Sequence, residues 1–262
     1  MHAVLLGASR NIGYHLLRDL ISTPSNTVTL LLRSPKCFDG DTDVTPAIES
    51  GQITIVEGDG MSVDDVAKCF ADGKQVDVVV STIGSFPVVT LTGFKLPIPN
   101  LCTVAAAAML INVAKLPQAT PPRVIVVSSM GIGSQHHIMP FALRIMYSLL
   151  LAGPHRDKEG LEYLVQHASR AMASPTDPRD VPGKDILTPE QLTAVPGSFL
   201  PEVILIRPAL LTDGEAKGRP SLRAGADIAT YSCSRKDVAG FIATECMPGQ
   251  QAWVNQGVVL GY

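Results

Sequence analysis

The chain opens with MHAVLLGASRNIGYHLL (residues 1–17), in which a short apolar run leads into a glycine-bearing turn. Residues 2–6 are typical of a buried strand. The apolar residues after the turn repeat at helical spacing, at Ile12, Leu16, Leu17, Leu20 and Ile21. This order brings unpaired helix N–H groups and the positive end of the helix dipole to a turn that a ligand can approach closely. The stretch therefore predicts an anion-binding site.

The spacing of glycines in this turn is unusual. Gly7 and Gly13 lie six residues apart, where a dinucleotide-binding turn usually carries a third glycine between them. Either Arg10 or Asn11 stands at that third position. Asn tolerates a positive φ better than other non-glycine residues, so Asn11 in the place of glycine costs less strain. We therefore expect a positive φ at Asn11.

Composition favours a small-molecule function. The chain has 262 residues, 46% of them apolar, enough for one large or two small cored domains. A formal charge of -3 without a Lys/Arg-rich run argues against a nucleic-acid partner. Five scattered cysteines without a CxxC pair indicate a reducing compartment. The start of the chain lacks the features of a secretion signal, and the apolar run 138–151 is shorter than the roughly 20 residues that span a bilayer. We expect a soluble, cytoplasmic protein without a membrane partner.

Short β-branched runs alternate with helical patterns along the chain, which is typical of βαβ units. Further strands are predicted at 27–32, 53–56, 76–80, 123–127 and 203–206, and helices at 63–70, 101–116, 139–150, 157–170 and 234–246. Ser234 would cap the last of these helices. The chain is predicted to be one α/β domain, 1–262, with a Rossmann-type doubly wound, mainly parallel sheet and helices on both faces. The Ala-rich helix 101–116 either packs in the core or offers a homodimer face.

Two segments interrupt this alternation. Residues 174–201 contain six prolines and cannot form a continuous helix, and residues 213–226 are irregular and rich in glycine. A connection as long as the first usually covers a site or is mobile. We expect both segments to lie on the substrate side, as a small C-terminal substrate-covering region, with 174–201 forming one wall of the substrate pocket.

Eight segments, taken in order, resemble the short-chain dehydrogenase/reductase superfamily. The resemblance is to its atypical NmrA-like, NAD(P)H-binding branch, and within that branch to the biliverdin-IXβ reductase/flavin reductase type. The segments are LLGASRNIG (5–13), TLLLRSP (29–35), VEGDGMSVDDV (56–66), VVVSTIGS (78–85), VIVVSSMG (124–131), HRDKEGLEYLV (155–165), VILIRPALL (203–211) and SRKDVAGFI (234–242). Each alone is unspecific, but the ordered series covers nearly the whole chain.

The charges after the second strand favour NADP(H) over NAD(H). An NAD site places a carboxylate at the end of that strand, whereas Arg33 and Lys36 stand here without an acid. The planar fork of Arg33 suits a phosphate and Lys36 adds a point charge, although both could instead cap a solvated loop. In the NADP-dependent members that the chain resembles, side chains at the positions of Ser9 and Arg10 reach the 2′-phosphate.

The resemblance extends the cofactor site to other strand ends. It implies that Asp59 hydrogen-bonds the adenine edge, although this residue could simply stabilise a turn between two glycines. It implies that Thr82, Ile83 and Gly84 line the ribose side. The predicted cofactor-binding residues of the first turn are Gly7, Ser9, Arg10, Asn11, Ile12 and Gly13. Lys158 is predicted to bind the cofactor from a later helix.

Carbonyl-reducing members of the superfamily generally use a Tyr-x-x-x-Lys pair, and here the tyrosine is missing. The aligned lysine is Lys158, and four residues before it stands Pro154. Lys158 is expected to face inward and bind the ribose, with an exposed pair to Glu162 as the alternative. Asp157 is expected to cap a helix. The other candidate catalytic residues are two serines at the end of the fifth strand and two substitute proton donors, namely Ser128, Ser129, His155 and Tyr147.

The missing acid restricts the chemistry. A positioned general acid contributes roughly 10²- to 10⁴-fold, so reduction of an isolated ketone is not expected. A conjugated acceptor such as a flavin, quinone, tetrapyrrole or enone delocalises the anion, and water can then deliver the proton. We predict an NADPH-dependent oxidoreductase of such a small molecule. Two alternatives stay open: a non-catalytic NADP(H)-sensing regulatory protein, and a cofactor-retaining isomerase or cyclase. No metal site is predicted, because His136 and His137 lack further ligands at suitable spacing.

Overall fold

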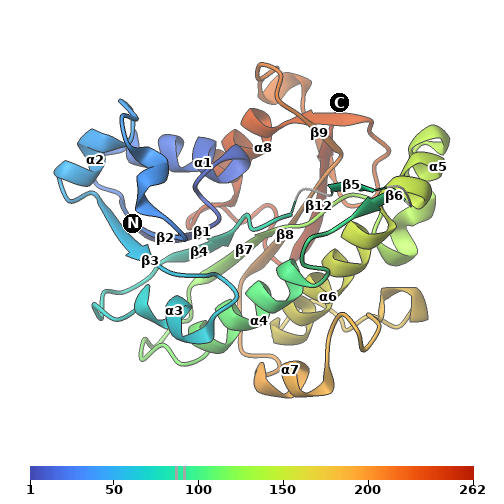
Figure 1. The fold of residues 1–262 in the computed structure, drawn as a ribbon, viewed down its shortest axis with the longest axis horizontal. Coiled ribbons are helices and arrows are strands. Elements are labelled where there is room, and N and C mark those ends of the chain that lie inside the picture. The colour runs from blue at the N-terminus through green and yellow to red at the C-terminus, as the bar shows by residue number, and fades with distance from the viewer. Residues whose placement is uncertain (86–87, 91–92) are drawn as a thin grey trace.

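A computed structural model describes residues 1–85, 88–90 and 93–262 of the chain. Its centre is an eight-stranded sheet of order β10-β12-β8-β7-β4-β1-β2-β3 (Figure 1). These strands are β1 (His2–Leu6), β2 (Thr27–Leu32), β3 (Ile53–Glu57), β4 (Val78–Ser81), β7 (Arg123–Val127), β8 (Val203–Pro208), β10 (Arg223–Gly225) and β12 (Gln256–Gly261). All neighbours pair in parallel except β10 and β12. The strand order reverses between β1 and β4, as in the predicted Rossmann fold, which is confirmed.

Helices cover both faces of this sheet (Figure 1). On one side lie α1 (Asn11–Ile21), α2 (Thr45–Glu49) and α8 (Arg235–Phe241), the last continued by a π-helical turn, Ile242–Cys246. On the other lie α3 (Val63–Lys68), α4 (Leu101–Val113), α6 (Ala152–Ala168) and α7 (Pro189–Ala194). Side chains alternate across each strand, so Ala3 and Leu5 of β1 join one core while Val4 and Leu6 join the other. The two cores fix the sheet in the middle.

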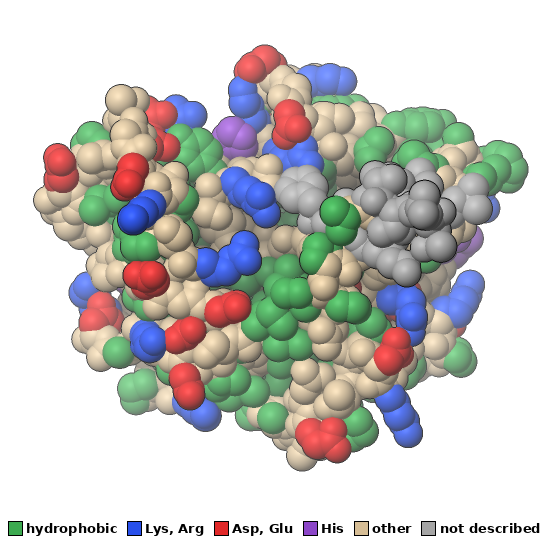
Figure 2. All heavy atoms as spheres, in the orientation of Figure 1, with side chains coloured by type: hydrophobic (Ala, Val, Ile, Leu, Met, Phe, Trp, Pro, Cys, Tyr) green, Lys and Arg blue, Asp and Glu red, His purple; other side chains and the backbone are tan. Residues whose placement is uncertain are grey.

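Smaller elements lie at the carboxyl edge of the sheet. A parallel pair joins β9 (Leu210–Thr212) to β11 (Ser232–Ser234), and a hairpin joins β5 (Val88–Thr90) to β6 (Gly93–Lys95). Helix α5 (Phe141–Leu150) directly precedes α6. Within the described residues no helix has both the length and the apolar character needed to cross a bilayer. On the face drawn in Figure 2, Lys and Arg side chains are scattered among Asp and Glu.

Local pattern predicted several elements to the residue. The strands predicted at 2–6, 27–32 and 123–127 have these bounds, and the Ser234 hydroxyl accepts a hydrogen bond from the Lys236 N–H, which confirms the predicted cap. The helix predicted at 157–170 was wrong at its start. It begins at Ala152, because Pro154 lies in the first turn, where its missing N–H costs no helical hydrogen bond. Strand β12 was not predicted.

The Ala-rich helix predicted at 101–116 is α4, and it packs in the core. Its alanines at 105–108 are buried, and it lies against α6. The two helices lie close together at Gly160, where an added Cβ would lie 2.3 Å from Thr103 Oγ1 and 2.8 Å from Ile186 Cγ2. A side chain at this position would force α6 away from α4.

Substitution of Gly160 with alanine tests this contact. We expect the free energy of unfolding to fall by about 1–3 kcal/mol, because the added methyl overpacks a close helix crossing. Gly153→Ala is the matched control on the same helix, since its Cβ would meet nothing within 4 Å. That change should be neutral or stabilise by up to about 1 kcal/mol. Urea unfolding of both variants measures the difference, and equal effects would contradict the packing argument.

Candidate dinucleotide-binding and active site

A cavity of about 660 Å³ lies at the carboxyl edge of the parallel strands. Residues from the ends of β1, β2, β4, β7 and β8 line it, together with residues of α5 and α6. In a doubly wound sheet this is the edge at which ligands bind, next to the point where the strand order reverses. Its volume falls within the range of about 300–1,000 Å³ that is usual for ligand sites.

The turn between β1 and α1 has the geometry expected from its sequence. Gly7 has φ +91° and Asn11 has φ +57°, so the prediction that Asn11 takes the place of the glycine is confirmed. A Cβ on Gly13 would lie 2.4 Å from Gly7 O and 2.5 Å from Thr82 Oγ1. The Thr82 hydroxyl donates to Gly7 O over 3.0 Å. The turn is thus pressed against the end of β4.

The first turn of α1 offers donors to an anion. The first backbone hydrogen bond within the helix runs from the Tyr14 N–H to Arg10 O at 3.3 Å, so the N–H groups of residues 11–13 precede it. The side chain of Arg10, the N-cap residue of this helix, makes no capping hydrogen bond to them. A phosphate placed over this turn would satisfy these donors and meet the positive end of the helix dipole.

The structure brings most of the predicted cofactor residues to this one cavity. The lining includes Gly7, Ser9, Arg10, Asn11, Ile12, Arg33, Asp59, Thr82, Ile83, Gly84 and Lys158. Gly13 lies behind the turn, where it permits the close approach of helix and strand. Lys36 is exposed on the short turn Pro35–Phe38 and is outside the lining. The Asp59 carboxylate lines the cavity and also accepts from the Met61 N–H at 3.0 Å, so it stabilises its own turn as well.

Lys158 points inward, as predicted. Its ammonium donates to the backbone oxygen of Val127, the last residue of β7, at 2.8 Å. It also donates to the backbone oxygen of Ile83, which follows β4, at 3.2 Å. The alternative pair with Glu162 does not form, because the Glu162 carboxylate binds the Arg207 guanidinium through hydrogen bonds of 2.6 and 3.0 Å. Lys158 therefore presents its charge at the sheet edge beside the cavity.

The other candidate catalytic residues also line this cavity. Ser128 Oγ and His155 Nε2 are buried and have no hydrogen-bond partner among the described residues. Ser129 Oγ makes one long contact, 3.4 Å, to Met130 O. The rings of Tyr147 and His155 meet edge to face with centroids 5.0 Å apart. Two elements, α5 and α6, thus bring these two rings together.

Burial fixes the protonation of both rings at neutral pH. It lowers the pKa of His155 to about 4, with a smaller contribution from nearby His136, so this imidazole is neutral. Burial also raises the pKa of Tyr147 to about 12, so the phenol keeps its proton. Cys102, which lines the same cavity, is buried and its pKa is raised to about 11, which leaves a neutral thiol.

The prediction that residues 174–201 form one wall of the pocket, with 213–226 beside it on the substrate side, was wrong. Of the described residues, none within 174–201 or 213–226 lines the cavity. The first segment instead buries Ile186, Leu187 and Val195 on the α4 and α6 side of the sheet. The wall comes from groups that the sequence did not single out, namely Leu96, Ile98, Leu151, Leu210, Leu211 and Arg235. Leu210, Leu211 and Arg235 lie in segments that carry the family resemblance, but nothing in those segments assigned them to the wall.

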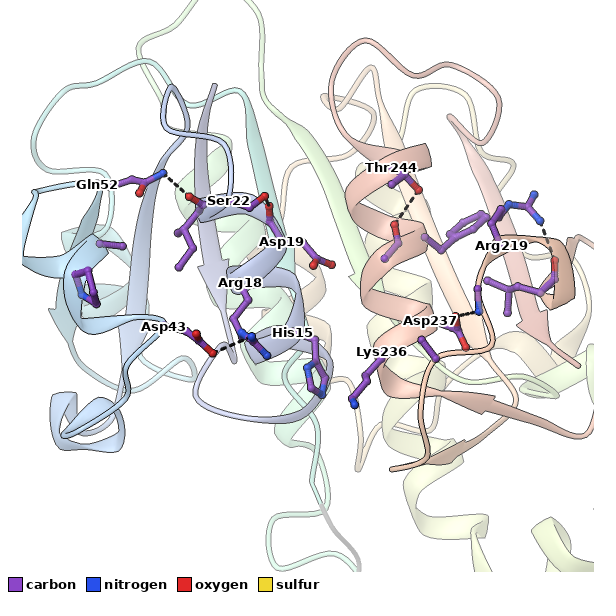
Figure 3. Close-up of a pocket in the computed structure, with 18 of the residues that line it drawn as sticks. His15, Arg18, Asp19, Ser22, Asp43, Gln52, Arg219, Lys236, Asp237 and Thr244 are labelled. Carbon is purple, nitrogen blue, oxygen red and sulfur yellow. Dashed lines mark hydrogen bonds and ion pairs between the residues drawn. The ribbon is translucent and has the colours of Figure 1, made fainter.

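A second cavity, of about 940 Å³, lies on the α1 and α8 side of the sheet (Figure 3). It lacks the glycine turn, and its cations already have carboxylate partners within the protein. Arg18 pairs with Asp43 at 2.8 Å, and Lys236 pairs with Glu215 at 2.7 Å. Among the described residues no three His, Cys, Asp or Glu side chains converge in a way that could hold a metal ion. The dinucleotide geometry therefore belongs to the first cavity.

Comparisons with known proteins agree with this geometry. A family model described as NAD(P)H-binding matches residues 7–169. Reductase pytE from Aspergillus terreus is 26% identical over 237 residues, a match that covers 85% of this chain and 79% of that protein. This relative is named as a reductase.

Solved structures share the fold over almost their whole length. ChuY, an anaerobillin reductase from Escherichia coli O157:H7, is similar with a TM-score of 0.63 at 16% identity, covering 100% of this chain and 97% of that one. A short-chain dehydrogenase/reductase from Veillonella parvula, in complex with NADP, gives a TM-score of 0.60 at 14% identity, covering 100% and 94%. The NAD(P)H-binding part of the resemblance drawn from the sequence is confirmed, and because the family model matches more than half of the chain, the protein belongs to the NAD(P)H-binding family.

Proposed function

We propose that the protein is an NADPH-dependent reductase of a conjugated small molecule. The observation that carries the proposal is the composition of the first cavity. It joins a phosphate-binding turn to an apolar end lined by Leu96, Leu151 and Leu210, and its titratable rings are a neutral imidazole and a phenol of raised pKa. Such a site suits hydride transfer to an acceptor that delocalises its own negative charge.

The preference for the 2′-phosphate rests on two arginines. Arg33 directly follows β2 and Arg10 precedes α1, and both line the cavity on its adenine side, where no carboxylate follows β2. A guanidinium binds phosphate oxygens through charge-assisted hydrogen bonds. The complex of the Veillonella parvula relative with NADP supports the same assignment.

The chain's own residues divide the remaining work. The bound nicotinamide would supply the hydride. Two of the three ammonium N–H groups of Lys158 donate to Ile83 O and Val127 O, which leaves one for a ribose hydroxyl. The buried Ser128 hydroxyl would donate to a substrate oxygen and so orient it. Tyr147 keeps its proton and could only donate a hydrogen bond as a neutral phenol.

Replacement of Arg33 by alanine tests the cofactor preference. We expect the Kd for NADPH to rise about 10- to 100-fold, the value of one charge-assisted hydrogen bond, and the Kd for NADH to stay within about twofold. Lys36→Ala is the control, because Lys36 is outside the cavity lining. Fluorescence titration measures both constants, and equal affinity of the parent protein for NADPH and NADH would refute the preference.

A panel of acceptors tests the chemistry. NADPH consumption should be measurable with flavins, quinones, tetrapyrroles or enones and slower by about 10²-fold or more with isolated ketones, since no acid of lowered pKa is available. The readout is absorbance of NADPH at equal acceptor concentration. Tight NADPH binding without turnover of any acceptor would instead favour the sensing protein or the isomerase, and it would refute the reductase.

The neutral imidazole of His155 predicts acid sensitivity. Its pKa is about 4 in the folded chain and 6.5 when unfolded, so its contribution to stability is complete above pH 6.5 and disappears as the pH falls to about 4. Between pH 7.5 and 4.5 the histidine should account for about 2.5 kcal/mol of lost stability, and this loss should be absent in His155→Phe, which keeps the ring against Tyr147. Urea unfolding at pH 7.5 and 4.5 measures it, with His137→Gln, an exposed histidine, as the control. An unchanged acid sensitivity in His155→Phe would contradict the assignment.

A further inference from the structure

Asp157 is the buried acid next to the lysine of the site. It lies in the second turn of α6 and is 1% exposed. Its carboxylate makes its hydrogen bonds outside its own helix. It accepts from the Cys102 N–H and the Thr103 N–H, both at 2.9 Å, and from the Thr103 hydroxyl at 3.0 Å. The expectation that Asp157 caps a helix holds for α4, not for the helix that carries it.

The start of α4 depends on this carboxylate. The preceding residue, Asn100, provides no side-chain cap, so the first N–H groups of the helix would otherwise have no acceptor. A negative charge at this end also interacts favourably with the helix dipole. Since Asp157 is buried, water cannot take over its hydrogen bonds. The interaction therefore joins α6 rigidly to the beginning of α4.

The same junction reaches the cavity. The single proton of the Thr103 hydroxyl is shared between the Asp157 carboxylate, at 3.0 Å, and the Asp157 backbone oxygen, at 2.8 Å, so this hydroxyl contacts both the side chain and the backbone of Asp157. Ile83 O accepts from Lys158 Nζ at 3.2 Å and from Cys102 Sγ at 3.6 Å. The start of α4, the segment after β4 and the ammonium of Lys158 thus meet at one place.

We propose that Asp157 is a positioning residue that holds Lys158 at the cofactor site. The assignment of the lysine to the cofactor rests on the proposed function. The buried pair of Glu162 with Arg207 lies one turn beyond the lysine, and a polar contact before it joins Arg156 to Asp185, whose side chains are both more than half exposed. Such a surface pair contributes little rigidity. Loss of the Asp157 carboxylate would let α6 shift, and the long side chain of Lys158 would leave its two carbonyl acceptors.

The first test reads Lys158 without any cofactor. Limited acylation with an amine-reactive ester, followed by mass spectrometry, reports how firmly the Lys158 ammonium is held. Asp157→Asn keeps the shape but replaces one of the two acceptor oxygens by an amide N–H₂, which then faces a backbone N–H donor. Labelling of Lys158 should therefore rise about threefold or more. Arg156→Ala, the adjacent surface change, should leave it as in the parent protein. Unchanged labelling in Asp157→Asn would overturn the proposal.

A second control separates positioning from general destabilisation. Glu162→Gln removes the charge of a buried carboxylate on the same helix, one turn beyond the lysine, where Glu162 pairs with Arg207, and should lower stability without raising Lys158 labelling. Equal labelling in Glu162→Gln and Asp157→Asn would overturn the proposal. If Asp157→Asn does not fold, Thr103→Val removes only the hydroxyl donor and should raise labelling in the same direction; unchanged labelling there would count against it.

The third test is a double-mutant cycle on NADPH affinity. Asp157→Asn should raise the Kd for NADPH about tenfold in the parent protein and leave it within twofold in a Lys158→Met background, because the lysine through which it acts is then gone. Equal losses in both backgrounds would mean an independent structural effect and would overturn the proposal. A parent protein that does not bind NADPH would refute the proposed function, and the labelling experiment would still decide whether Asp157 positions Lys158.

Discussion

The turn after β1 packs so closely against the end of β4 that the space between them holds backbone atoms but no added side chain at Gly7 or Gly13. Gly7 and Gly13 supply that room, since a Cβ on Gly13 would collide with Gly7 O and the Thr82 hydroxyl. Because α1 can therefore start directly above the sheet edge, its first N–H groups face the cavity. Any side chain at Gly13 would lift the helix away and remove the anion site. The cofactor site depends on this close approach more than on any single charged residue.

The missing tyrosine has a structural counterpart at the other end of the cavity. Pro154 occupies the first turn of α6, and the nearest phenol, that of Tyr147, comes from α5. In a Tyr-x-x-x-Lys pair the lysine lowers the pKa of the phenol, whereas burial raises that of Tyr147 to about 12. The lysine is retained but bound to two carbonyl oxygens. Under the proposed function, Lys158 would hold the dinucleotide, while the one tyrosine among the described residues that line the cavity has a raised pKa.

The sequence was sufficient wherever structure follows from neighbouring residues. Strand β1, strand β2 and the positive φ of Asn11 all follow from local sterics and periodicity. It was insufficient where a partner is distant. The acceptor for the start of α4 is 55 residues away, so no local pattern could assign Asp157 to it. The proline-rich segment was misplaced for the same reason, because proline content excludes a helix but does not say which surface a segment covers.

The buried polar atoms show where the fold alone is incomplete. Folded proteins satisfy more than about nine-tenths of such atoms, and here both oxygens of each buried carboxylate, Asp157 and Glu162, accept a hydrogen bond. Among the described residues, four buried side-chain atoms lack a partner, and two of these, Ser128 Oγ and His155 Nε2, line the same cavity. An unpaired buried polar group costs about 1–3 kcal/mol, so a ligand that pairs with either atom would recover that energy. A polar ligand group at the apolar end of the cavity, beyond the phosphate turn, would supply the partner that these two atoms lack within the described protein.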